Sequence, residues 1–264
     1  MKKFDGILLC TDFDNTLAYH KQISAENAEA IRYFQANGGR FTVISGRQPE
    51  FLEEHLKDCP ANAPLVGYNG AQIKDHQSGE VLYEGGRNDC KALELLEPFW
   101  RQGEQIKKII AFDNSGFESC QMRELTRQSP FTIEELKELI SFPLYKVVCS
   151  VDSEQYSTML RDALSASFGD LFEISRSCPT YMEISCIDAC KGVAARRLKE
   201  MLGAKLLVTA GDYENDVSML KAADIGYAVG NASPEVKAAA DRVTVSVEQH
   251  AIAAIIKELE QELS

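Results

Sequence analysis

The chain has 264 residues, enough for one large domain or two unequal ones, and its hydrophobic fraction of 45% suits a globular protein with a sizeable core. Its net charge of −12, without a dense cluster of lysine and arginine, argues against a nucleic-acid-binding protein. The sequence has neither a bilayer-spanning apolar run nor the long apolar core of a signal peptide, so we expect a cytoplasmic protein without a membrane partner.

The first part of the chain alternates predicted strands with predicted helices. The strands cover 7–11, 40–45 and 64–73, and the helices cover 24–37 and 46–58. Ser24 is the predicted N-cap of the first helix, and an Asn-Gly pair marks a turn in the third strand. This alternation predicts a parallel sheet with helices on its faces.

The character of the chain changes after about residue 84, where the polar, Gly-rich stretch EGGRNDC can serve as a linker. The predicted helices that follow cover 89–103, 132–141 and 153–168, and the predicted strands cover 106–112, 144–152, 171–175 and 180–185. Their order predicts a second α/β unit, built on a smaller and largely antiparallel sheet.

The pattern of the first part returns from Ala189 onward. The predicted helices cover 189–202, 215–223, 233–240 and the residues from about 248, and the predicted strands cover 205–212, 225–230 and 242–246. We therefore predict an α/β protein with a Rossmann-like parallel-sheet core domain. This core consists of residues 1–84 and 186–264, and an α/β domain of residues 85–185 is inserted into it.

Eight cysteines are spread along the chain without a CxxC pair. Several lie inside apolar runs, as Cys149 does in KVVCSV, so we predict buried, reduced thiols rather than a disulfide scaffold. Cys186 and Cys190 are four residues apart, but the lack of a nearby histidine or third cysteine argues against a metal site there.

Residues that could form a site lie at the ends of three of the predicted core strands and at the start of one helix. They are Asp12 and Asp14, then Ser45, Gly46 and Arg47, then Asp212, and Lys191 at the start of a helix. Ligands of an open parallel sheet bind beyond the carboxyl ends of its strands, so we expect these residues to meet at one edge. Each feature alone has an ordinary explanation, such as a turn aspartate or a solvated lysine, whereas the four together favour a site.

The residue types of this site indicate phosphate chemistry. Carboxylate oxygens without histidine or cysteine favour Mg²⁺, while a serine hydroxyl and a lysine ammonium can hold phosphate oxygens. A carboxylate can also attack phosphorus and form an aspartyl-phosphate. Because side chains alternate along an extended segment, Asp12 and Asp14 point in different directions, so one can attack phosphorus while the other handles protons.

Four motifs in this order resemble the haloacid dehalogenase-like (HAD) superfamily and, within it, the Cof-type phosphatases with a large α/β cap. DFDNT (12–16) is similar to the DxDx[TV] motif, Ser45 in TVISGR matches the second motif, and Lys191 in DACKGVAARRL matches the third. The stretch 211–241, GDYENDVSMLKAADIGYAVGNASPEVKAAAD, resembles the fourth motif and its continuation, and GYNGAQI also fits the family. The insert at 85–185 lies where this subfamily has its cap.

The resemblance implies the residues that perform the reaction. Asp12 would be the nucleophile that takes the phosphoryl group, and Asp14 would protonate the leaving oxygen and then activate water. Ser45 and Lys191 would bind the phosphoryl oxygens, and Asn215 would contact the substrate phosphate.

The resemblance also implies a metal site. Mg²⁺ would bind the carboxylates of Asp12 and Asp212 and the backbone carbonyl of Asp14, and Asp216 would support it through its water shell. The backbone N–H group of Gly46 would add a donor for phosphate. This chain departs from the family pattern at Asn15, where many members have glycine.

The sequence therefore predicts a Mg²⁺-dependent phosphatase of a small phosphorylated metabolite, a sugar phosphate or a phosphorylated cofactor. Two alternatives stay open: a phosphomutase or phosphotransferase of the same superfamily, and a non-catalytic Mg²⁺-dependent protein that binds a phospho-ligand. Candidate contacts for substrate choice are Arg47 on the core and Arg176, Tyr181 and Glu183 on the insert. The sequence indicates neither a protein partner nor an oligomeric state.

Overall fold

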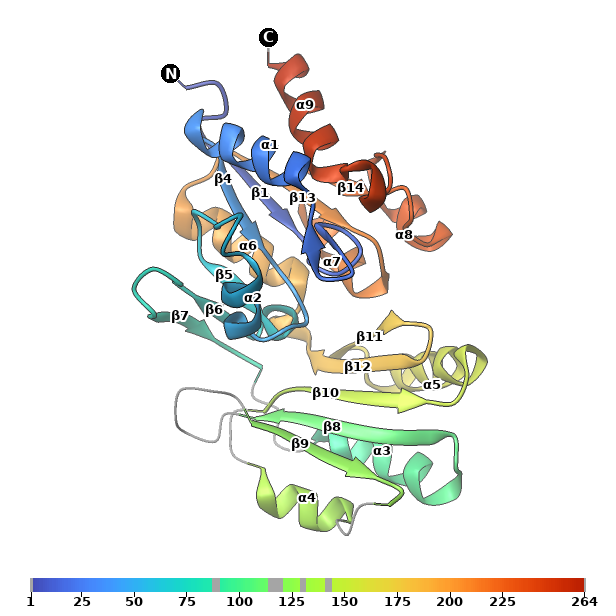
Figure 1. The fold of residues 1–264 in the computed structure, drawn as a ribbon. Coiled ribbons are helices and arrows are strands. Elements are labelled where there is room, and N and C mark those ends of the chain that lie inside the picture. Colours follow the sequence, from blue (N-terminus) through green and yellow to red (C-terminus); the bar gives the residue numbers. More distant parts are fainter. Residues whose placement is uncertain (1, 87–90, 114–120, 129–131, 141–143, 264) are drawn as a thin grey trace. The chain divides into compact units, whose positions relative to one another are not determined.

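The computed structural model describes residues 2–86, 91–113, 121–128, 132–140 and 144–263. The chain forms two compact units, one made of Met1–Tyr83 and Lys191–Ser264 and the other of Glu84–Cys190 (Figure 1). The first unit thus resumes at Lys191, the first residue of a helix, whereas the predicted insert ends at residue 185. The second unit therefore also includes a short 3-10 helix, Ile187–Ala189, which lies between its last strand and Lys191.

A five-stranded sheet forms the centre of the first unit. Its strand order is β15 (Arg242–Val243), β14 (Ile225–Ala228), β13 (Leu206–Gly211), β1 (Ile7–Thr11) and β4 (Arg40–Val43). All of its strand pairs are parallel, and β1 lies between β13 and β4. Every residue of β1 is buried, which explains why this strand is an unbroken run of mostly apolar residues.

Helices cover both faces of this sheet. They are α1 (Ala25–Ala36) and α9 (Ala251–Glu262) on one face, and α6 (Lys191–Leu202) and α7 (Val217–Ala222) on the other (Figure 1). Ile7 and Leu9 of β1 pack with α1 and α9. Leu8 and Cys10 point the opposite way and pack with α6 and α7. Alternate side chains of β1 therefore pack into two apolar cores, one on each face of the sheet. The predicted parallel sheet with helices on both faces is confirmed.

The first helix forms where its sequence predicts it. The Ser24 hydroxyl accepts a hydrogen bond from the backbone N–H of Asn27 at 3.2 Å, so it caps the N-terminus. Ala28, Ile31 and Phe34 are buried along one face of the helix. Two short helices complete the unit, α2 (Pro49–His55) and α8 (Pro234–Ala239), and each has proline in its first turn.

The single strand predicted over 64–73 is wrong. The chain forms two antiparallel strands there, β5 (Leu65–Gly67) and β6 (Gln72–Lys74), and β7 (Val81–Glu84) completes a three-stranded sheet. The turn between β5 and β6 has positive φ angles at Tyr68 (52°), Asn69 (59°) and Gly70 (115°), which reverse the chain. The Asn-Gly pair marks this turn. A two-strand hairpin of β2 (Ala18–Tyr19) and β3 (Gln22–Ile23) was not predicted.

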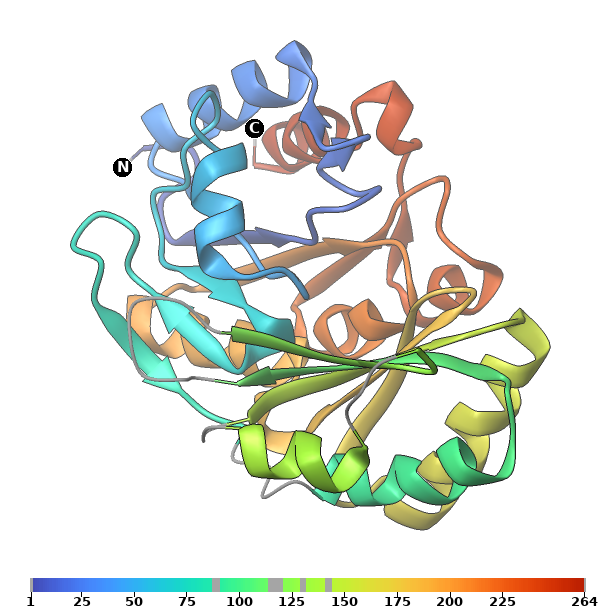
Figure 2. The same ribbon diagram turned by 60° about the horizontal axis from the view of Figure 1, so that its bottom comes forward.

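The sheet of the second unit is antiparallel, as predicted, but it has five strands, as many as the core sheet, and is therefore not the smaller sheet that was expected. Its strand order is β11 (Phe172–Cys178), β12 (Tyr181–Cys186), β10 (Leu144–Val151), β8 (Ile106–Asp113) and β9 (Gln121–Thr126), of which β9 was not predicted. The helices α3 (Lys91–Gln102), α4 (Ile133–Leu139) and α5 (Glu154–Phe168) lie along one face of the sheet (Figure 2). Part of the predicted linker and the first two residues of the helix predicted from 89 fall at 87–90, outside the described residues.

None of the six described cysteines forms a disulfide, which agrees with the prediction of reduced cysteines. They are Cys10, Cys59, Cys149, Cys178, Cys186 and Cys190, and all but Cys178 are buried. Burial raises the pKa of the Cys149 thiol to about 12, so it stays protonated at neutral pH. Cys90 and Cys120 lie outside the described residues.

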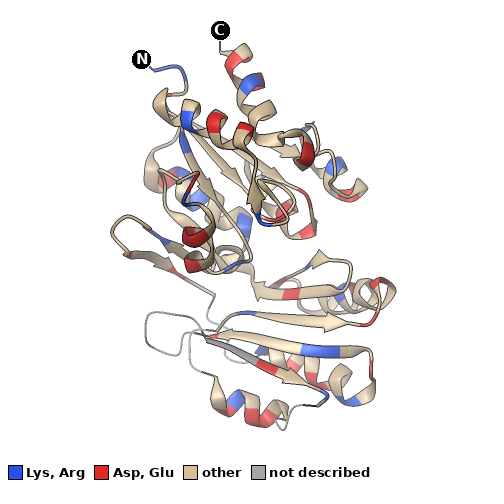
Figure 3. Cartoon of the chain, in the orientation of Figure 1, with Lys and Arg blue, Asp and Glu red and all other residues tan. Residues whose placement is uncertain are grey.

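Acidic and basic side chains are interspersed along the helices and strands of both units (Figure 3). Oppositely charged neighbours form ion pairs, for example Lys108 with Glu124 at 2.7 Å on adjacent strands of the second unit. Among the described helices, none has the length and apolarity that a membrane crossing requires.

Candidate active site

Two central strands deliver the first acidic side chains. Asp12 follows β1 directly, and its backbone N–H donates to the carbonyl of Ala210 at 2.9 Å, so the strand register continues to this residue. Asp212 follows β13, the neighbouring strand. Both carboxylates therefore lie at the carboxyl edge of the parallel sheet, where the topology predicts ligand binding.

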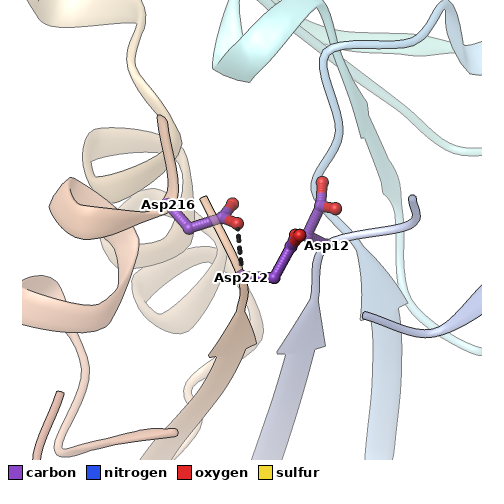
Figure 4. A group of neighbouring side chains, drawn as sticks. All are labelled: Asp12, Asp212 and Asp216. Atoms are coloured by element: carbon purple, nitrogen blue, oxygen red, sulfur yellow. Dashed lines mark hydrogen bonds between the residues drawn. The ribbon is translucent and has the colours of Figure 1, made fainter. Parts of the chain in front are cut away.

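Three buried carboxylates converge at this edge (Figure 4). Asp12, Asp212 and Asp216 each offer one oxygen, and these oxygens lie within 4.8 Å of one another. Oδ2 of Asp216 accepts hydrogen bonds from the backbone N–H groups of Asp212 at 2.9 Å and Tyr213 at 3.2 Å. A Cβ at Gly211 would lie 2.4 Å from Cβ of Asp216, so glycine is what lets Asp216 approach the strand end.

Lys191 supplies the positive charge within this cluster. Its Nζ donates to Oδ1 of Asp12 and to Oδ1 of Asp216, each at 2.6 Å, and its side chain is only 1% exposed. Burial opposes the charged ammonium, but the two carboxylates outweigh it and raise the pKa of Lys191 above its usual value. Lys191 is therefore held as a cation between two elements that are distant in sequence.

The cluster still has more negative than positive groups. Burial, together with the neighbouring carboxylates and against the effect of Lys191, raises the pKa of Asp12 to about 7 and that of Asp212 to about 8. A divalent cation would relieve this repulsion. Among the described residues, no donor bonds to Oδ2 of Asp12 or of Asp212, whereas Thr16 donates to Oδ1 of Asp212 at 3.1 Å. A set of oxygen ligands with open positions fits a hard cation such as Mg²⁺.

Asp14 lies outside the carboxylate cluster. Its Oδ2 accepts from Nε of Arg47 at 2.9 Å, and its Oδ1 accepts from Nη2 of Arg47 at 3.1 Å. The Asp14 side chain is 38% exposed, whereas that of Asp12 is 9% exposed. The two aspartates of the first motif thus occupy different environments, one buried beside a lysine and the other partly exposed beside an arginine.

Ser45 and Asn215 are connected by Asn69, which was not among the predicted site residues. The backbone N–H of Asn69 donates to the carbonyl of Ser45 at 2.9 Å, and Oδ1 of Asn69 accepts from Nδ2 of Asn215 at 3.4 Å. The Ser45 hydroxyl accepts from the backbone N–H of Arg47 at 3.1 Å, with Gly46 in the loop between them. Asn69 is buried and has a positive φ, and both features single it out in the structure as a candidate site residue. The sequence at this position indicates only a turn.

The structure also explains Asn15. Its φ is 59°, in the left-handed region that favours glycine and that asparagine tolerates better than most residues. Its backbone N–H donates to the carbonyl of Ala18 at 2.8 Å, and its own carbonyl accepts from Nδ2 of Asn231 at 2.9 Å. Asparagine therefore supplies the left-handed conformation that the turn after Asp14 requires.

The candidates on the insert point to different faces of its sheet. Nη1 of Arg176 donates to Oγ1 of Thr158 at 2.8 Å and pairs with Glu154 at 3.3 Å, so it lies under helix α5. Glu183 pairs with Lys146 of the adjacent strand at 2.9 Å. Met182, its neighbour in the chain, is the strand partner of Arg176, so Glu183 and Arg176 lie on opposite faces of the sheet. Glu183 is therefore on the face without helices, together with Tyr181.

A known protein family matches most of this chain. The sequence profile of the haloacid dehalogenase-like hydrolases matches residues 9–256. The chain belongs to this family. The resemblance to HAD-like, Cof-type proteins is therefore confirmed, and the inserted antiparallel unit corresponds to their cap.

Relatives of the HAD-like chain match it over most of their length. Phosphatase YwpJ of Bacillus subtilis is 26% identical over 289 residues, covering 96% of this chain and 99% of that protein. The 5-amino-6-(5-phospho-D-ribitylamino)uracil phosphatase YcsE of the same organism is 25% identical, covering 90% and 89%. A solved haloacid dehalogenase-like hydrolase from B. subtilis has the same fold, with a TM-score of 0.77 and 23% identity over 96% of this chain and 99% of that one.

Proposed function

We propose that this HAD-like protein is a Mg²⁺-dependent phosphatase that releases inorganic phosphate from a small phosphorylated metabolite. The observation that carries the proposal is the contact of Lys191 with both Asp12 and Asp216, beside Asp212. This arrangement combines a held carboxylate nucleophile with a buried cation, as phosphoryl transfer requires. Two relatives named as phosphatases, one of them of a phosphorylated ribitylamino compound, support a small phosphorylated substrate.

The reaction has two halves that use the same residues. In the first, a carboxylate oxygen of Asp12 forms a bond to phosphorus while the bond to the leaving oxygen breaks, and Asp14 gives its proton to that oxygen. In the second, Asp14 takes a proton from water as the water oxygen attacks phosphorus and the bond to Asp12 breaks. Lys191 and the Ser45 hydroxyl hold phosphoryl oxygens, and Asn215, Gly46 and Asn69 line the same edge.

The acidic cluster is the proposed metal site. Asp12 and Asp212 would hold Mg²⁺ through their carboxylates and Asp14 through its backbone carbonyl. Asp216 already uses both oxygens on Lys191 and two backbone N–H groups, which supports an indirect role through water. When bound, Mg²⁺ neutralises charge on the phosphoryl oxygens.

The substrate class is testable with purified protein and a panel of phosphorylated metabolites. We expect Mg²⁺-dependent release of inorganic phosphate from at least one sugar phosphate or phosphorylated cofactor. No release from any compound, with Mg²⁺ present, would contradict the proposal and favour a binding protein. Acceptor sugars added to the same reactions separate hydrolysis from transfer, because a phosphomutase or phosphotransferase would yield a phosphorylated acceptor.

Mg²⁺ is expected to stabilise the protein more at high pH than at low pH. The folded-state pKa values of Asp12 and Asp212 lie near 7 and 8, above their ordinary value of 3.8, so the metal-free fold loses stability as pH rises toward 8. Protons compete with the metal below that range. Melting temperatures measured with and without Mg²⁺ at about pH 5 and about pH 8 should therefore differ most at the higher pH.

The matched control for this measurement is Asp212→Asn, which removes one proposed ligand and keeps the side-chain shape. Its Mg²⁺-induced rise in melting temperature should be much smaller than that of the wild type at the higher pH. A rise of the same size in both proteins would place the bound Mg²⁺ elsewhere.

A further inference from the structure

We propose that Arg47 is a positioning residue that aims the carboxyl group of Asp14 at the leaving oxygen of the substrate. The inference rests on the proposed phosphatase function and assigns Arg47 a role different from direct phosphate binding. It follows from the way in which the arginine is held and from the group to which it donates.

The first observation is the paired contact itself. Nε and Nη2 of Arg47 donate to the two different oxygens of Asp14, at 2.9 and 3.1 Å. A planar guanidinium that meets both oxygens fixes the plane of the carboxyl group as well as its distance. When Asp14 carries the proton, one oxygen becomes the O–H donor while the other can still accept from Arg47. The contact therefore restricts the direction in which the proton is offered.

The second observation is that Arg47 is itself anchored. Its backbone N–H donates to the Ser45 hydroxyl at 3.1 Å, and its carbonyl accepts from the N–H of Tyr68 at 3.0 Å. Its guanidinium carbon lies 4.8 Å from the ring centroid of Phe51. Phe51 in turn meets the ring of Phe13, the residue between the two aspartates, edge to face at 5.7 Å. Arg47 thus links the end of β4 to the first motif.

The third observation is the exposure of the pair. The side chains of Arg47 and Asp14 are 44% and 38% exposed, and ion pairs of this kind contribute little to folding stability. The buried positive charge of the site is already supplied by Lys191, which contacts Asp12 and Asp216. Orientation of Asp14 is the effect that an anchored, bidentate, partly exposed arginine can supply here.

The test uses the acidity of the leaving group. An alkoxide needs a proton as it leaves, whereas para-nitrophenolate is stable without one. A badly oriented Asp14 should therefore slow the cleavage of an alkyl phosphate severely and that of para-nitrophenyl phosphate only slightly. The measured quantity is kcat/KM, which covers the steps up to the aspartyl-phosphate and excludes the later attack by water. Para-nitrophenyl phosphate, phenyl phosphate and an alkyl phosphate form the series.

Arg47→Met keeps the apolar stem and removes the guanidinium. We expect kcat/KM for the alkyl phosphate to fall at least about tenfold, because positioned acids contribute about 10²–10⁴-fold, and that for para-nitrophenyl phosphate to fall no more than about threefold. Arg47→Lys keeps the charge but not the fork, so its loss on the alkyl phosphate should be intermediate. Arg101→Met is the matched control, since Arg101 is an exposed arginine bonded to Glu97, and it should leave all three values unchanged.

A double-mutant cycle separates positioning from binding. In the Asp14→Asn background, Arg47→Met should change kcat/KM for the alkyl phosphate by less than about twofold, because the group that it aims is gone. Equal losses on all three esters, with a raised KM and additive effects in the cycle, would overturn the inference and make Arg47 a phosphate-binding residue. A wild-type protein inactive on every ester would overturn the proposed function as well, so the two failures are distinguishable.

Discussion

Asp12→Asn is expected to lower kcat/KM for the best substrate of the panel by at least about 10⁴-fold, because the amide cannot form the aspartyl-phosphate. Asparagine keeps the size of the buried side chain, so the fold should persist. Phosphate release measures the rate, and mass spectrometry of rapidly quenched protein detects the covalent phosphoryl adduct. The adduct should be present in the wild type and absent from the variant.

Two other substitutions sharpen this result. Asp162→Asn makes the same chemical change at an exposed aspartate paired with Arg161, and it should leave the rate unchanged. Asp14→Asn should still form the adduct from para-nitrophenyl phosphate but hydrolyse it slowly, so that the adduct accumulates. Phosphate release by Asp12→Asn within about tenfold of the wild type would exclude Asp12 as the nucleophile.

Much of the fold can be predicted because local pattern and tertiary environment agree. Ile7–Thr11 reads as a buried strand because both of its faces meet helices, and Ser24 marks a helix start because its hydroxyl caps the first turn. At β5 and β6 the Asn-Gly pair predicted a turn, but one continuous strand was expected rather than two strands that pair across that turn. Tyr68 adopts a positive φ that an aromatic residue rarely takes, and its N–H is held by the carbonyl of Arg47. The local propensity of Asn69 and Gly70 and the long-range contact of Tyr68 therefore both contribute to that turn.

The site also has a part that could be predicted from the sequence and a part that could not. Asp12, Asp212 and Lys191 could be grouped from the sequence because parallel strands place their carboxyl ends at one edge. The contact between Arg47 and Asp14 could not, because it depends on the direction of two long or flexible side chains after two different strands. Asn69 was missed for a related reason: a turn sequence does not reveal that its side chain meets Asn215.

Lys191→Met is the substitution with the largest expected effect on stability. It removes the ammonium that contacts Asp12 and Asp216 and leaves two buried carboxylates without their shared cation. Breaking a buried ion pair by removing one partner typically costs about 3–5 kcal/mol in the free energy of unfolding. Urea unfolding without Mg²⁺ measures this loss. Lys199→Met, in the same helix, is the control; Lys199 makes a partly exposed pair with Asp224, and its loss should stay below about 1 kcal/mol.

The pH dependence of this loss identifies its cause. Burial raises the pKa of Asp12, and the charge of Lys191 partly offsets this rise. Removing the lysine therefore raises the pKa of Asp12 further. A carboxyl group whose folded-state pKa is raised loses stability as pH rises through that value, so the cost of Lys191→Met should be greatest at about pH 8 and shrink toward about pH 5. Mg²⁺ should recover part of the stability at the higher pH but not the phosphate release, because the phosphoryl contact of the ammonium is still absent. An equal cost at both pH values would instead attribute the loss to the packing of the lysine stem.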